Sequence, residues 1–61
     1  MKHYEAAIGS YFLGSHDGYT SYEALFYFNR ELHGSVKVFT LYEDGKMIGT
    51  MNRTTGHWTE A

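Results

Sequence analysis

The segment Val36–Arg53 limits the fold of this chain more than any other feature. Its centre, Asp44-Gly45, is among the strongest short signals for the tight turn of a β-hairpin. The flanking runs, 36–42 and 47–53, suit strands, and both faces of the resulting hairpin are apolar. In a chain of 61 residues a single helix can cover only one of those faces. The other face needs the first segment of the chain, a second copy, a partner or a ligand.

The register of the hairpin depends on the length of its turn. A two-residue turn gives the pairs Glu43–Lys46, Tyr42–Met47, Leu41–Ile48 and Val38–Met51. One face then carries Phe39, Leu41 and Ile48, and the other carries Val36, Val38, Tyr42, Met47 and Met51. A three-residue turn with Gly45 in a bulge shifts the pairing by one residue but still leaves both faces apolar.

A helix is predicted over residues 21–33. Thr20 suits the N-cap, and Glu23 completes a Thr-x-x-Glu capping box, in which each side chain accepts from the other residue's backbone amide. His33 lies in the last turn, and Gly34 follows it as a stop signal. The stripe predicted to face the core comprises Tyr22, Leu25, Phe26, Asn29 and Leu32, which Tyr27 and Phe28 widen.

The remaining segments are less regular. Residues 4–13 have apolar side chains at helical spacing, but Gly9 and Ser10 weaken a helix, and the Tyr, Ile and Phe content favours a strand. Residues 14–18, GSHDG, are predicted to form a loop. Residues 54–61 contain Trp58 and either form a short strand or stay loose.

These segments predict a single small α+β domain over residues 1–61, arranged β-α-β-β with the helix on one face of an antiparallel or mixed sheet. If residues 4–13 are helical, the order is α-α-β-β instead. A core of this size rarely supplies more than about 3–5 kcal/mol, and without cysteine no disulfide can add to it. We therefore expect a homodimer or higher oligomer that covers the second face of the hairpin.

The composition argues against several classes of function. A net charge of −2 with scattered Lys and Arg lacks the basic stripe of a nucleic-acid-binding protein. The four histidines have no metal-ligand spacing, and no metal or other cofactor is expected. No residues form a nucleophile–base motif, so we expect no enzyme. The chain shows no signal peptide and no membrane-length apolar run, which favours a cytoplasmic location, in the host cell if the protein is viral.

The aromatic content carries the functional signal, because Tyr joins apolar area to a polar tip and suits binding surfaces; six tyrosines occur here. Taken as a complete protein, the small, acidic, cysteine-free chain is similar in type to phage-encoded or accessory inhibitors that bind a host protein. That similarity of type implies a non-catalytic protein-binding module. The residues predicted to contact a partner or a second copy are Tyr42, Met47, Met51, Val38, Trp58 and Tyr27.

The alternative function is sequestration of a small, nucleotide-like ligand by an oligomer. The ligand would bind between subunits, where positive charge and an aromatic ring could hold it. The candidate ligand-binding residues are Arg30, Arg53 and Tyr11.

Overall fold

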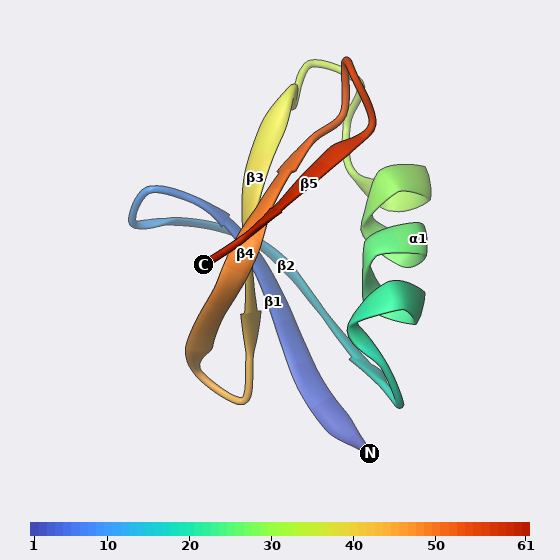
Figure 1. The fold of residues 1–61 in the computed structure, drawn as a ribbon, viewed down its shortest axis with the longest axis vertical. Helices are drawn as coiled ribbons and strands as arrows, with labels where there is room; N and C mark the ends of the chain where they lie inside the picture. Colours follow the sequence, from blue (N-terminus) through green and yellow to red (C-terminus); the bar gives the residue numbers. More distant parts are fainter.

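In the computed structural model, which describes residues 1–61, one helix packs on a single five-stranded sheet (Figure 1). The elements in chain order are β1 (Lys2–Ile8), β2 (Tyr11–Gly18), α1 (Ser21–Glu31), β3 (Val38–Glu43), β4 (Lys46–Asn52) and β5 (His57–Glu60). The strands lie in the order β2-β1-β3-β4-β5, and every neighbouring pair is antiparallel. The α+β class is confirmed. The predicted orders β-α-β-β and α-α-β-β are both wrong, because two strands precede the helix and three follow it.

The first two strands form a hairpin that the sequence did not reveal. Residues 4–13 are neither one strand nor a helix, because the chain turns at Gly9, whose φ of 59° lies in the left-handed region. Residues 14–18 are not a loop but the second half of β2. Gly18 lies close to the helix, since a Cβ there would be 2.6 Å from Glu23 Oε2.

The helix begins as predicted. The Thr20 side chain accepts a hydrogen bond from the Glu23 amide at 3.1 Å, so the N-cap is confirmed. The Glu23 carboxylate contacts His16 Nε2 on β2 at 3.3 Å and does not accept from the Thr20 amide, so the second half of the predicted capping box is wrong. The helix ends at Glu31, before the predicted His33, because Leu32 adopts an extended conformation with ψ of 147°.

The second hairpin has the predicted turn but a different register beyond it. Asp44 and Gly45 both have positive φ, as a two-residue turn of this type requires, and Tyr42 pairs with Met47. The next residue, Ile48, is the extra residue of a β-bulge, so the pairing continues as Leu41–Gly49 and Phe39–Met51. The predicted Leu41–Ile48 and Val38–Met51 pairs are therefore wrong.

The bulge decides which side chains enter the core. Because the bulge adds one residue, it moves Met51 to the helix side of the sheet, where only 7% of its surface is exposed. The core consists of Tyr4, Ala6, Ala24, Leu25, Phe28, Phe39, Leu41 and Met51.

The core extends from the helix into the middle of the sheet. Phe28 and Phe39 meet edge to face with their ring centroids 5.9 Å apart. Tyr4, which is fully buried, donates to the Glu43 carboxylate at 2.7 Å. Burial and this hydrogen bond raise the pKa of Tyr4 to about 12, so its hydroxyl remains a donor at neutral pH.

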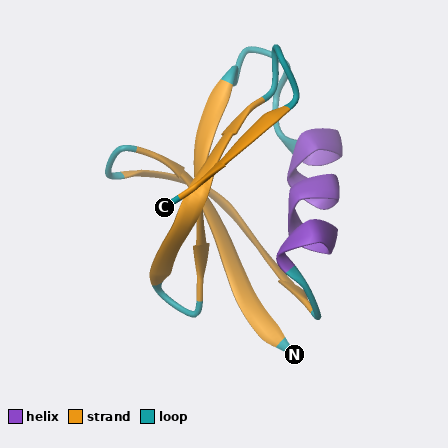
Figure 2. Ribbon diagram, in the orientation of Figure 1, coloured by secondary structure: helices purple, strands orange, loops and turns teal.

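The helix covers one side of the sheet and only part of its width. Figure 2 shows α1 on one side of the sheet, with no helix on the other. The contacts of α1 with the sheet are mainly with β2 and β1. Residues 57–60 of the tail form β5, the fifth strand, beside β4. The sheet is strongly twisted (Figure 1), and β4 and β5 extend beyond the cover of the helix.

Candidate functional site

A groove lies between α1 and the uncovered end of the sheet at β5. It has a volume of about 770 Å³, and its walls come from both elements. The apolar residues that line it are Tyr22, Leu25, Phe26, Met51 and Trp58. The helix supplies one wall because residues four apart in sequence, here Tyr22 and Phe26, lie on the same face.

The aromatic side chains on the helix side of the groove are mostly exposed to solvent. Tyr22 is 86% exposed and Phe26 is 70% exposed, although both stand beside the buried Leu25. The Arg30 guanidinium lies over the Phe26 ring, 5.8 Å from its centroid, and Arg30 itself does not line the groove. These two rings therefore offer apolar area that the chain itself does not bury.

Trp58 forms the opposite wall of the groove. Its indole lies over Gly49 on β4, so closely that a Cβ at Gly49 would lie 2.5 Å from the ring atom Cη2. Trp58 is also the cross-strand partner of Met51, which forms part of the core. The ring is half-buried and fixed against the sheet, while its remaining surface lines the groove.

Sequence reasoning named Trp58 but missed Tyr22 and Phe26. Both aromatic residues were assigned to the core stripe of the helix, whereas the residues that the helix buries are Ala24, Leu25 and Phe28. The signal that could have found them is Ala24, because a small residue marks the line along which a helix approaches a sheet most closely. Centring the stripe there would have turned Tyr22 and Phe26 outward.

The outer face of the sheet carries three of the predicted contact residues. Val38 and Met47 are 43% and 47% exposed there, and Tyr42 pairs with Met47 on the same face. Threonines separate them, because Thr40 pairs with Thr50, and Thr50 also pairs with Thr59. This face is therefore a mixture of apolar and hydroxyl groups rather than a continuous apolar surface.

The other predicted contact residues lie elsewhere. Met51 is on the opposite face from Val38, Tyr42 and Met47, so its placement on their face was wrong. Tyr27 stacks on the His16 ring at 4.1 Å and is half-buried between helix and β2. The structure therefore divides the six residues between the outer face, the core, the helix–β2 contact and the groove.

The candidate ligand-binding residues are not brought together. Tyr11 is exposed at the start of β2, Arg30 is exposed on α1 with its Nε 3.1 Å from Glu31, and Arg53 follows β4. No pocket is lined by two of them.

Arg53 has a structural task in this fold. Its guanidinium donates to four backbone carbonyls at the end of the helix and in the loop that follows, at 2.8–3.2 Å. The acceptors are those of Asn29, Leu32, His33 and Val36. Carbonyl groups at a helix C-terminus have no partner within the helix and carry partial negative charge, which suits a cation.

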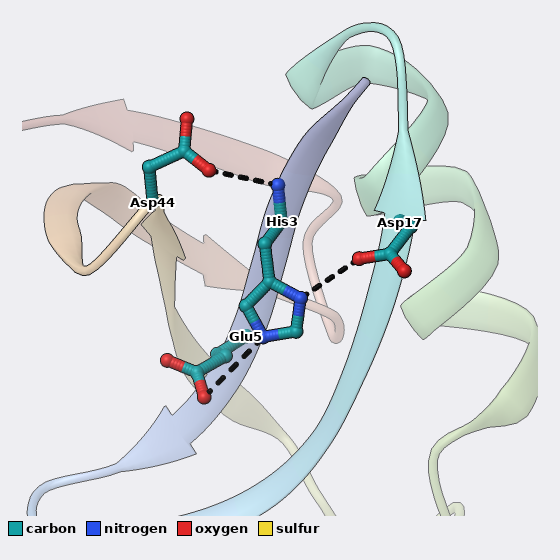
Figure 3. A network of polar contacts seen from close by, with 4 residues as sticks. All are labelled: His3, Glu5, Asp17 and Asp44. Atoms are coloured by element: carbon teal, nitrogen blue, oxygen red, sulfur yellow. Dashed lines mark hydrogen bonds and ion pairs between the residues drawn. The ribbon is translucent and has the colours of Figure 1, made fainter.

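A polar network lies at the N-terminal end of the sheet (Figure 3). His3 Nδ1 is 2.8 Å from the Asp17 carboxylate, and His3 Nε2 is 3.6 Å from Glu5. The His3 amide donates to the Asp44 carboxylate at 2.9 Å, which ties β1 to the hairpin turn. The hydrogen bond to Asp17 is the main cause that raises the pKa of His3 above its ordinary 6.5. No three His, Asp or Glu side chains form an arrangement that could hold a metal ion.

Comparisons with protein-family models, curated proteins and solved structures find no match to this chain. The helix α1 is too short and too polar to cross a membrane.

Proposed function

We propose that this chain is a small non-catalytic protein-binding module that recognises its partner through the groove between α1 and β5. The observation that carries the proposal is the pair of exposed rings on the helix, Tyr22 and Phe26, facing a fixed Trp58 across the groove. Aromatic side chains are enriched in the centres of protein interfaces, where Trp and Tyr often supply most of the binding energy.

The three exposed aromatic side chains supply only part of the binding free energy that a tight complex needs. Burying an aromatic side chain fully is worth roughly 1.5–3 kcal/mol. Three such side chains could supply several kcal/mol, but association itself costs at least about 4 kcal/mol. Apolar contact alone would therefore leave weak binding, and a tight partner must add hydrogen bonds or charge contacts at the groove.

In this proposal the chain acts as an inhibitor or accessory protein, phage-type in character, that occupies a surface of a host protein in the cytoplasm. The groove side would contact the target. The outer face, with Val38, Tyr42 and Met47, remains available for the homo-oligomer expected from the sequence.

The alternative, sequestration of a nucleotide-like ligand, has weaker support. Its main cation, Arg53, already directs its guanidinium at four carbonyls, so a phosphate there would have to displace those bonds. Arg30 and Tyr11 line no pocket with it.

The proposal can be tested by partner capture from extracts of the source organism, with crosslinking and mass spectrometry. Phe26→Ala should abolish capture while the urea midpoint stays near that of the wild type, since the ring is mostly exposed. Tyr11→Ala is a matched control, because Tyr11 is also 70% exposed but lies on β2, outside the groove. Loss of capture with Tyr11→Ala but not with Phe26→Ala would place the contact surface elsewhere and refute the proposal.

A further inference from the structure

The strand that borders the groove, β5, has an unpaired edge. It pairs with β4 on one side only, and it ends the sheet. The Ala61 amide donates to the Ile48 carbonyl on β4 at 3.1 Å. Because residues of an antiparallel strand alternate in the direction of their backbone groups, Thr59 also faces β4, whereas Trp58 and Glu60 direct their N–H and C=O groups away from the sheet. These outward groups are free to pair with another strand.

The side chains of the same two residues line the groove. Trp58 and Glu60 pair with Met51 and Gly49, and all four lie on the helix side of the sheet. A strand added along β5 would therefore place every second side chain over the groove, against the rings of Tyr22 and Phe26. Free backbone groups and apolar pockets for alternate side chains are the two elements of peptide recognition by strand addition.

The charges at the groove are all of one sign. Glu23 and Glu60 are its charged lining residues, and no Lys, Arg or His lines it. The Glu23 carboxylate contacts His16, whereas the carboxylate of Glu60 makes no ion pair within the chain. A partner segment with a basic side chain opposite Glu60 complements this surface, and a second acidic copy of this chain complements it less well.

The other edge of the sheet is less suited to strand addition. The β1–β2 ladder contains a bulge at Leu13, which breaks the regular spacing of backbone groups along β2. No register shift interrupts β4–β5.

We propose that the groove receives an extended segment of a partner protein, which pairs with β5 as a sixth strand. Its alternate apolar side chains pack on Tyr22, Phe26 and Trp58, and a Lys or Arg contacts Glu60. This inference rests on the proposed function and names the form and charge of the partner's contact.

The test uses a displayed library of random linear nonapeptides, selected on the full chain and then measured as synthetic peptides. Trp58 is the only tryptophan, so its fluorescence reports directly on the groove. Glu60→Pro removes the outward amide without removing a bond to β4, since proline is tolerated on an edge strand whose N–H faces solvent. Glu60→Gln keeps the amide and removes only the charge, which makes it the matched control.

We expect the selected peptides to alternate apolar residues with polar ones and to contain Lys or Arg. They should shift the Trp58 emission and bind Glu60→Pro at least about tenfold more weakly, the effect of losing roughly 1.4 kcal/mol. Glu60→Gln should weaken binding by a smaller, salt-dependent factor, since the contact is partly exposed. The amides of Trp58 and Glu60 should become protected from hydrogen exchange on binding.

Three results would overturn the inference. The first is that no peptide is selected, and the second is that the selected peptides bind Glu60→Pro as tightly as the wild type. The third is that sedimentation shows a dimer that Glu60→Pro converts to a monomer, which would assign the β5 edge to a second copy. If partner capture still depends on Phe26 in any of these cases, the proposed function stands and only the mode of recognition is wrong.

Discussion

Replacing Arg53 with alanine tests how the short helix is held to the sheet. The guanidinium donates four hydrogen bonds to backbone carbonyls around the C-terminus of α1. A single hydrogen bond to a charged group contributes about 1.5–3 kcal/mol, and a cation near a helix C-terminus adds about 0.3–1 kcal/mol. The four bonds share one group and part of the site is open to water, so their energies do not add. We expect Arg53→Ala to lower the free energy of unfolding by about 2–4 kcal/mol.

That loss is a large share of the stability of so small a chain. A single core of this size rarely supplies more than about 3–5 kcal/mol, so Arg53→Ala should be mostly unfolded at room temperature or close to it. The assay is urea denaturation followed by Trp58 fluorescence and by far-ultraviolet circular dichroism, which report on the sheet and the helix separately.

Two controls separate the causes. Arg53→Lys keeps the positive charge but cannot reach four acceptors from one compact ammonium group, so it should recover only a minor part of the loss. Arg30→Ala removes an exposed arginine whose ion pair is with Glu31, and it should change stability by less than about 0.5 kcal/mol. If Arg53→Ala unfolds at the same urea concentration as the wild type, the carbonyls do not need this guanidinium and the reasoning is refuted. If Arg53→Lys equals the wild type, charge alone accounts for the effect.

Two further predictions concern the sheet. Gly49→Ala should destabilise the chain by about 1–3 kcal/mol and shift the emission of Trp58, because the new methyl group would overlap the indole ring. The control in the same urea assay is Gly34→Ala, where a Cβ meets nothing within 4 Å. Equal urea midpoints for the two variants would contradict the close contact between Gly49 and Trp58. The protonated His3 paired with Asp17 stabilises the folded chain fully below pH 6.5, and this contribution should disappear as the pH rises through the raised pKa of His3 in the folded state. His3→Gln should remove this pH dependence of the urea midpoint. A variant with the same pH dependence as the wild type would show that the pair with Asp17 does not form in solution.

Local signals in the sequence predicted the elements that depend on neighbouring residues. The N-cap at Thr20 involves an amide three residues away, and the hairpin turn involves only the positive φ angles of Asp44 and Gly45. Both were confirmed because their chemistry is complete within one turn of chain. The first hairpin was missed because Gly9-Ser10 is a weak turn signal and because Gly18 resembles a loop residue when the helix above it is not yet known.

The candidate site shows the same division. Trp58 could be named from its residue type, but its role as a wall of the groove depends on Gly49, which lies beneath its ring on the neighbouring strand. Tyr22 and Phe26 were assigned to the core because an apolar stripe alone does not say where its centre lies. The buried Ala24 marks that centre, but only the packed structure shows that the sheet lies against this side of the helix.

The sequence by itself determined that this chain has a capped helix, a tight Asp-Gly hairpin and more apolar surface than one helix can cover. The tertiary structure decided the register beyond the turn, the side of the sheet that Met51 faces, and the use of Arg53 as a clamp on the helix rather than as a ligand residue. The physical reason is distance along the chain. Caps and turns are satisfied by groups a few residues apart, whereas a bulge, a buried face and a guanidinium clamp depend on contacts that exist only after distant segments have packed together.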